Sequence, residues 1–289
     1  MIAQINRSQF SSPCGSPQRW LLQGRPFHGS CCPLPIAKAD YIEGLAKGLA
    51  VLEAFDTERQ RLNATLAAQR TGITRAAARR HLLTLAELGY LETDGSHYWL
   101  SPRVLRLAGS YMATSRLPRT LQPTLNRLAA QTQAAFSAVV LDHDECVIVA
   151  RSAGVAEPVR HLAYGLHLGA RLPAHATSTG RVLLASLPKA DFTAWLKGRE
   201  LARITPQTEV NAARFKALVE QVRQADHCLA RDGHELGIHA LAVPLRNMQG
   251  QTLAALNVVG TADQLSDAAV QRKWLPLLLD AARELRPLL

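Results

Sequence analysis

The fold of the N-terminal part of the chain is decided by residues 74–88, which read T-R-A-A-A-R-R-H-L-L-T-L-A-E-L. Thr74 is placed to cap a helix, and Gly89 follows where the helix would end. At a helical period the apolar positions form one stripe, which consists of Ala78, Leu82 and Leu85. The stretch therefore predicts a helix that packs along one side and faces solvent along the other.

The outward side of this helix is basic, and so is the segment around it. Between residues 59 and 86 there is no Asp or Glu, and the six arginines are Arg59, Arg61, Arg70, Arg75, Arg79 and Arg80. A one-signed segment of this kind indicates a polyanionic partner. Small side chains such as Ala76 would let the backbone approach a groove wall, where guanidinium groups reach phosphates or guanine.

The neighbouring segments favour DNA binding over a merely solvated helix face. Residues 42–56 have the spacing of an amphipathic helix, and a short second helix is expected between Asn63 and Gly72. Residues 91–100 predict a hairpin with a D-G turn, so the segment reads as a winged helix-turn-helix. We expect Arg75 and Arg80 to bind mainly phosphates and Arg79 a phosphate or a base edge. The full predicted DNA-binding set is Thr74, Arg75, Ala76, Ala77, Arg79, Arg80, Thr84 and, in the wing, His97.

Composition describes an ordinary globular protein with a basic balance. The 289 residues include 33 Lys plus Arg against 23 Asp plus Glu, and the length favours about two domains. No apolar run approaches the roughly 20 residues of a membrane span, so no membrane partner is expected. Five cysteines without C-x-x-C spacing predict neither a disulfide framework nor a zinc site, which fits the cytoplasm. We expect no metal and no cofactor.

The chain divides, by pattern, into four segments. Residues 1–40 are rich in proline and read as a disordered tail or a misassigned translation start, and residues 41–101 form the winged helix-turn-helix. A linker helix is expected over 102–117. Residues 118–289 alternate helical and strand patterns, which predicts an α+β domain with an antiparallel sheet covered by helices.

One motif of the second domain, H-A-T-S-T-G at residues 175–180, admits two interpretations. A helix start with three hydroxyl residues suits an anion, yet plain capping by Thr177 or Ser178 needs no ligand and is favoured by the local sequence. A nucleophilic Ser178 beside His175 lacks the G-x-S-x-G context. A metal site is not indicated by the spacing of Cys228, His234 and His239.

Several separate motifs resemble the IclR family of bacterial transcriptional regulators from residue 41 to the end. The helix-turn-helix block R-T-G-I-T-R-A-A-A-R-R-H-L-L-T-L-A-E-L-G-Y-L is most similar to the branch that controls protocatechuate, 4-hydroxybenzoate and β-ketoadipate catabolism. L-G-A-R-L-P-A-H-A-T-S-T-G-R-V-L-L-A and A-L-N-V-V-G resemble the start and the closing strand of the effector domain. The resemblance implies a winged helix-turn-helix joined to a GAF/PAS-like effector-binding domain, assembled as homodimers or tetramers on palindromic double-stranded DNA.

The resemblance also implies a ligand site and a mode of action. It reverses the preference for plain capping and selects Ser178 and Thr179 as anion-binding N–H donors, facing Ala240, Asn257 and Val259 on the last strands. A small, aromatic carboxylate effector is implied, with apolar walls expected from Leu162, Leu172 and Leu241. Activation of catabolic genes, with RNA polymerase as a further partner, is favoured over catalysis. The alternatives are a repressor that responds to an aliphatic acid and, last, a metabolite-binding protein or hydrolase without a DNA function.

Four residues depart from the family pattern. His81 stands on the flank of the packed helix face, where a buried imidazole would need a partner. Gly233 and His239 replace expected charged residues, and Asp226 stands where a helix-ending glycine is common. We expect Asp226 to adopt the left-handed conformation at some cost.

Overall fold

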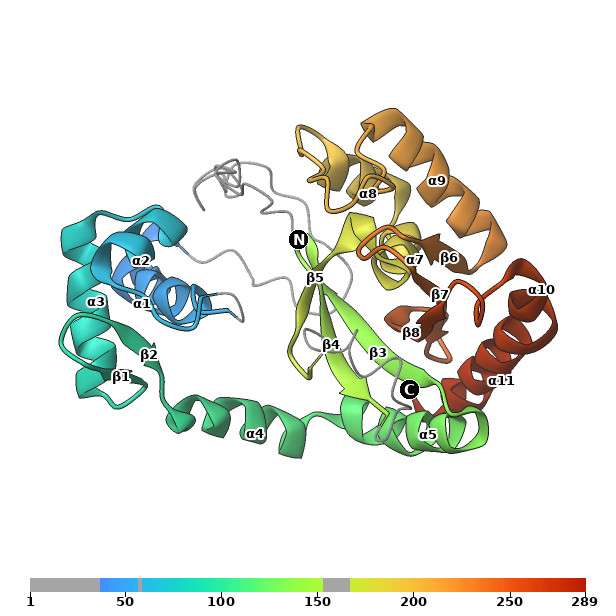
Figure 1. The fold of residues 1–289 in the computed structure, drawn as a ribbon, viewed down its shortest axis with the longest axis horizontal. Coiled ribbons are helices and arrows are strands. Elements are labelled where there is room, and N and C mark those ends of the chain that lie inside the picture. The colour runs from blue at the N-terminus through green and yellow to red at the C-terminus, as the bar shows by residue number, and fades with distance from the viewer. Residues whose placement is uncertain (1–36, 57–58, 153–166) are drawn as a thin grey trace. The chain divides into compact units, whose positions relative to one another are not determined.

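The computed structural model describes residues 37–56, 59–152 and 167–289. The chain divides into two compact units, with the division between Ser115 and Arg116 (Figure 1). Each unit has a hydrophobic core of its own. Among the described residues, no helix has the length and apolar character that a membrane crossing requires.

The first unit packs its first three helices and a small hairpin around one core, and a fourth helix follows. Its elements are a 3-10 turn Lys38–Asp40, α1 (Glu43–Glu53), α2 (Ala64–Thr71), α3 (Arg75–Glu87), β1 (Leu91–Thr93), β2 (Tyr98–Leu100), a 3-10 turn Pro102–Val104 and α4 (Leu105–Thr114). The strands pair antiparallel, with Leu91 opposite Leu100. The core gathers one side of each helix with the hairpin, and its buried members are Val51, Ala67, Ala78, Leu82, Leu85, Leu91 and Tyr98. The predicted winged helix-turn-helix is confirmed.

Local side-chain chemistry sets the helix ends in this unit. The Asn63 side chain accepts hydrogen bonds from the amides of Thr65 and Leu66, at 3.1 and 3.0 Å, and so starts α2. Gly72 ends α2 in the left-handed conformation, φ 69°, which glycine adopts without steric cost. Thr74 then caps α3 through Oγ1, which accepts from the Ala77 amide at 3.3 Å.

The boundary after α4 differs from the expected one. Ser115 has an extended conformation and separates α4 from α5 (Arg116–Thr132), so α5 begins inside the segment 102–117 that was expected to form one linker helix. Pro118 lies in the first turn of α5, where the missing N–H removes no intrahelical hydrogen bond. The helix break therefore comes from Ser115 rather than from Pro118.

The second unit is built on one six-stranded antiparallel sheet in the order β5-β4-β3-β8-β7-β6. The strands are β3 (Ala135–Asp142), β4 (Glu145–Arg151), β5 (Arg171–Pro173), β6 (Cys228–Arg231), β7 (Ile238–Arg246) and β8 (Thr252–Thr261). The helices are α5, the 3-10 turn Ala174–Ala176, α7 (Ser178–Ser186), α8 (Lys189–Leu196), α9 (Ala212–Ala225), α10 (Asp267–Ala269), a π-helical segment Val270–Trp274 and α11 (Leu275–Leu285), followed by a 3-10 turn Arg286–Leu288. The predicted α+β class with an antiparallel sheet is confirmed.

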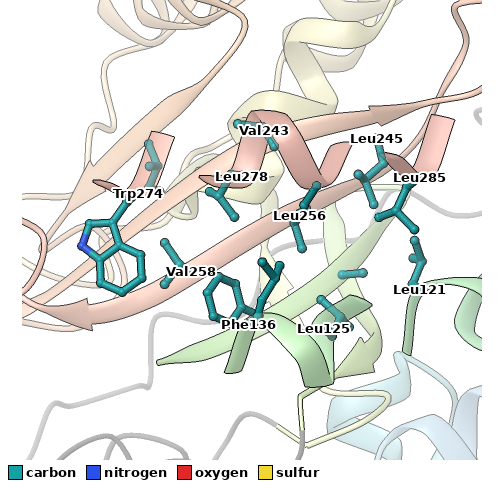
Figure 2. Packing of buried hydrophobic residues seen from close by; sticks show 14 of the residues in the cluster. Leu121, Leu125, Phe136, Val243, Leu245, Leu256, Val258, Trp274, Leu278 and Leu285 are labelled. Carbon is teal, nitrogen blue, oxygen red and sulfur yellow. The ribbon is translucent and has the colours of Figure 1, made fainter. Parts of the chain in front are cut away.

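Helices cover both faces of this sheet. On one face, α5 and the C-terminal helix pack Leu121, Leu125 and Leu278 against Phe136 and Leu256 (Figure 2). On the other face, α7, α8 and α9 build a second core, in which Phe215 lies against Trp195 with ring centroids 6.2 Å apart. The sheet thus has two different buried sides, and the strand register decides which side chain meets which core.

Two elements of this unit were not predicted. Strand β6 is only four residues long and forms by pairing with β7, with Cys228 opposite Ala242. The helical stretch from Asp267 to Leu285 contains a π-helical turn, in which the Leu275 amide donates to the Val270 carbonyl. Pro276 follows at once and has no N–H to donate, so the wider turn precedes the residue that cannot continue an α-helical ladder.

Candidate nucleic-acid interface and ligand site

The outward side of α3 is exposed as predicted. Arg75, Ala76, Arg79, Arg80 and Thr84 face solvent, together with the cap Thr74, and Ala77 is half-buried. The opposite side packs, with Ala78 and Leu82 fully buried. The helix therefore presents guanidinium groups and small side chains on one side, at the geometry that a groove-binding helix needs.

Five of the six arginines of the basic segment fall into two groups. Arg70 forms an ion pair with Asp56, and Arg61 lies 3.5 Å from an Asp94 oxygen and 4.3 Å over the Trp99 ring. Acidic residues outside the acid-free segment therefore neutralise these two. Within the described part of the chain, no ion pair involves the three arginines of α3, namely Arg75, Arg79 and Arg80.

The position of Arg75 adds to this contrast. It is the first residue of α3, and the first turn of that helix contains no acidic residue. A cation at a helix N-terminus opposes the helix dipole, so Arg75 does not serve helix stability. An external anion would offset this cost.

The wing is organised around one carboxylate. Asp94 accepts hydrogen bonds from the amides of Ser96 and His97, at 2.9 and 2.7 Å. These bonds, the His97 amide first, lower the pKa of Asp94 to about 2. The half-buried His97 ring contacts the Ser96 hydroxyl at 2.9 Å, so its position is fixed by the turn. We did not predict that Arg61 stacks on Trp99 beside this turn.

His81 is half-buried beside α1. A Cβ placed on Gly48 would lie 3.7 Å from its Nδ1, which is ordinary van der Waals contact. Among the described residues no hydrogen-bond partner is found for this imidazole, so the partner that we expected for a buried ring is not provided.

At the start of α7, the residue that caps the helix is different from the residues that were predicted to bind the ligand. Thr177 is the cap, and its Oγ1 accepts from the Gly180 amide at 3.1 Å. Ser178 follows as the first helical residue, 1% exposed, and Thr179 is buried as well. The cap therefore leaves the Ser178 hydroxyl uncommitted. A side chain at Gly180 would overlap the Ala174 carbonyl, so glycine is required for this close approach.

The strand residues predicted to face Ser178 share one side of the sheet. Ala240 pairs with Val259, and Ala242 pairs with Asn257 across β7 and β8. Ala242 belongs to the core under α7 and α9, so its cross-strand partner Asn257 points to that side. Alternation along the strands places Ala240 and Val259 there too. The structure thus brings all five predicted ligand residues to the space between α7 and the sheet.

Two of these residues carry buried polar atoms without a partner. Ser178 Oγ and Asn257 Oδ1 are shielded from solvent, and neither forms a hydrogen bond in the described chain. An unmade hydrogen bond at a buried polar atom costs roughly 1–3 kcal/mol. The two atoms lie on facing elements, Ser178 on α7 and Asn257 on β8.

The expected apolar walls need one correction. Leu241 is fully buried in the core against α5 and α11, on the side of the sheet that faces away from α7. The expectation that it lines the ligand site was wrong, because neighbouring strand residues alternate sides. Leu172 packs against the core on the α7 side, and Leu162 lies outside the described residues.

His175 and Arg181 hold the α7 start in place. The His175 Nε2 lies 2.8 Å from the Ala202 carbonyl, and burial lowers the pKa of this imidazole. Arg181 Nε donates to the His175 carbonyl at 3.0 Å. The Nε2 contact ties the His175 ring to the segment around Ala202.

The departures at the end of α9 and beyond are also explained. Asp226 takes the left-handed conformation, φ 59°, as expected. Its carboxylate binds Arg246 through two hydrogen bonds of 2.6 and 2.5 Å, which a glycine would not provide. Gly233 packs so closely that a Cβ would lie 2.7 Å from the Ala176 carbonyl. His239 is buried, with Nε2 at 3.8 Å from Asp232.

Comparison with known proteins decides the family. The IclR helix-turn-helix domain matches residues 44–95, and the family described as bacterial transcriptional regulator IclR C-terminal matches residues 109–286. The chain belongs to the IclR family of bacterial transcriptional regulators. It is therefore a DNA-binding regulator and not an enzyme.

The chain is similar to two regulators of Acinetobacter baylyi. It is 45% identical to the Pca operon regulatory protein, over 91% of this chain and 94% of that protein. It is 50% identical to the p-hydroxybenzoate hydroxylase transcriptional activator, over 88% and 94%. These relatives confirm the predicted likeness to the protocatechuate and 4-hydroxybenzoate branch.

A solved structure is similar to the second unit. A double mutant of the PobR transcription factor inducer binding domain from Acinetobacter, in complex with 3-hydroxybenzoic acid, has 44% sequence identity and a TM-score of 0.55. The match covers 60% of this chain and 98% of that one.

Proposed function

We propose that the chain activates genes of aromatic-acid catabolism when a hydroxybenzoate occupies the space between α7 and the sheet. The main support for this proposal is that two buried atoms on facing elements, Ser178 Oγ and Asn257 Oδ1, have no hydrogen-bond partner. The likeness to a hydroxybenzoate activator and to a hydroxybenzoic acid complex supports the ligand class.

The polar groups available match the two ends of such a ligand. The amides of Ser178 and Thr179, at the positive end of α7, have no intrahelical acceptor and suit a carboxylate. Asn257 Oδ1 is a hydrogen-bond acceptor, which suits a phenolic hydroxyl. The small side chains Ala240 and Ala242 lie on the same side of the sheet, where the ring of such a ligand would contact them.

A nearly isosteric replacement of Asn257 tests the proposed contact with the ligand's hydroxyl group. We expect the wild-type protein to bind 4-hydroxybenzoate more tightly than benzoate in calorimetric titrations. Asn257→Leu removes the acceptor, and the preference should fall roughly tenfold, mostly through weaker 4-hydroxybenzoate binding. Asn126→Leu, the same change at an exposed position of α5, serves as the matched control. An unchanged preference in Asn257→Leu refutes this assignment.

On the DNA side, α3 lies in the major groove and the wing against the backbone. Arg75 and Arg80 bind phosphates, and Arg79 binds a phosphate or a base edge. Thr74, Ala76, Ala77 and Thr84 line the approach, and His97 contacts the backbone from the wing. The support is the exposed, unpaired guanidinium groups of α3.

A second copy of the chain completes the regulator. The first unit exposes large apolar side chains on α1, at Ile42, Leu45 and Leu49, and on α4, at Leu105 and Tyr111. Apolar faces of this kind mark association surfaces, and a homodimer would match a palindromic operator. Dimers can pair further into tetramers.

The remaining assignments follow from this role. Residues 41–101 act as the DNA-binding domain, 102–117 as the linker and 118–289 as the effector domain. Work on chromosomal DNA places the protein in the cytoplasm, and activation involves contact with RNA polymerase. The ligand acts by binding one arrangement of the dimer more tightly than another, which shifts operator affinity or polymerase contact.

A further inference from the structure

A second cavity lies between α7, α9 and β6, and neither Ser178 nor Asn257 lines it. Its volume is about 220 Å³. The walls combine apolar and polar side chains, among them Leu218, Leu229, Arg181, Gln221 and His227. The cavity therefore offers an apolar surface next to a cation.

Arg181 is the unusual member of this lining. The residue is only 6% exposed, and it lines the cavity. Nε donates to the His175 carbonyl, and the group lies beside the Cys228 thiol, which burial keeps protonated by raising its pKa. Among the described residues, Arg181 forms no ion pair and its Nη atoms reach no oxygen acceptor. A buried cation without a counter-charge is costly.

The carboxylates on the neighbouring segments have other partners. Glu220 binds Lys189 at 3.1 Å, and Asp226 is held by Arg246 at 2.6 Å. Asp232 accepts from the Gly237 amide at 2.6 Å. None of these three carboxylates forms an ion pair with Arg181.

The backbone also leaves no room for an acidic side chain at position 233, next to Arg181. A Cβ on Gly233 would lie 3.5 Å from Arg181 Nη2, but only 2.7 Å from the Ala176 carbonyl. No side chain fits there to supply a negative charge. Within the described residues, no acidic side chain therefore neutralises Arg181.

We propose that this cavity binds a small organic carboxylate as a second ligand site. The guanidinium fork of Arg181 pairs with the carboxylate, which matches its planar, bidentate geometry. A short apolar body lies against Leu218 and Leu229. At about 220 Å³ the cavity has the volume of on the order of seven water molecules, which suits a few-carbon acid better than a drug-sized ligand. The site is separate from the α7–sheet site and does not rest on the proposed function.

The test is equilibrium dialysis of radiolabelled butyrate against the full-length protein. Saturable binding is expected, and both Arg181→Gln and Ala225→Phe should weaken it at least tenfold. Ala225 is exposed and lines the cavity, so the larger ring fills it without altering a buried group. This second variant keeps the test valid if Arg181→Gln fails to fold. The matched control is Ala213→Phe, on the exposed first turn of the same helix and outside the lining.

Several other results would overturn the proposal. Absence of saturable butyrate binding to the unmodified protein overturns the proposal, as does equal binding by Ala225→Phe. Loss of binding in Ser178→Ala, with full binding in Ala225→Phe, would place butyrate in the α7–sheet site. That result overturns this inference and leaves the proposed function standing. Inorganic phosphate should compete poorly because it has no apolar body, and equal competition by phosphate would refute the carboxylate assignment.

Discussion

Replacement of Arg80 by alanine tests whether α3 is the element that binds the phosphate backbone. Arg80 is exposed in the middle of the helix, on the side opposite Leu82. No carboxylate within the described residues pairs with it, so its loss leaves no orphaned acidic group. Any effect on operator binding then reports a contact with DNA rather than a disturbed fold.

The expected magnitude follows from counterion release. Each neutralised phosphate on duplex DNA contributes about 0.9 to the slope of log affinity against log salt. A dimer presents Arg80 twice, so the variant should lower the slope by about 1.8. Between roughly 50 and 200 mM salt, the affinity of the variant should therefore fall on the order of tenfold less than that of the unmodified protein.

The assay is fluorescence anisotropy of a labelled operator fragment across a salt series. Arg70→Ala is the matched control, because it removes the same charge from the same segment, where the guanidinium is already bound to Asp56. We expect its slope to stay within error of the unmodified protein. Equal slopes for Arg80→Ala and the unmodified protein, or a larger change in Arg70→Ala, would refute the placement of α3 against the duplex.

Three further predictions concern the fold around the two sites. Gly180→Ala should destabilise the protein by about 1–3 kcal/mol in thermal unfolding, because the new methyl group overlaps the Ala174 carbonyl; an unchanged Tm would show that α7 shifts freely. Asp94 has a folded pKa of about 2, below the ordinary 3.8, so its stabilisation of the wing is complete above pH 3.8 and is lost as the pH falls through 2. The NMR signals of the Ser96 and His97 amides should shift with this titration, and the shift should be absent in Asp94→Asn. Burial raises the pKa of the Cys146 thiol to about 12, so iodoacetamide at pH 8 should modify this thiol only after unfolding. Labelling of Cys146 in the native protein, detected by mass spectrometry, would contradict its burial.

The helix-turn-helix could be predicted from the sequence because its determinants are local. Asn63 and Thr74 cap helices through bonds to amides two or three residues away, and Gly72 ends a helix by its own backbone conformation. None of these effects depends on distant chain. The apolar spacing of α3 likewise identified Ala78 and Leu82 as packed positions.

Features that depend on distant partners could not be predicted in the same way. Strand β6 is too short for an alternating pattern and exists because it pairs with β7. Along A-L-A-V-P-L both sides of the strand are apolar, so the pattern does not tell which side meets α7, and Leu241 was placed on the wrong one. The ion pairs of Arg61 and Arg70 use acidic residues from outside the acid-free segment.

The contrast between paired and unpaired polar groups carries more information than their number. Arg70 and Arg246 are each bound to an aspartate, which explains them by the fold alone. The α3 arginines and the buried atoms of Ser178 and Asn257 have no such partners among the described residues. The exposed arginines are hydrated, whereas each unmet hydrogen bond at a buried atom costs stability. We interpret both features as sites for partners that arrive from outside, a polyanion at α3 and, in the proposed function, a polar ligand under α7.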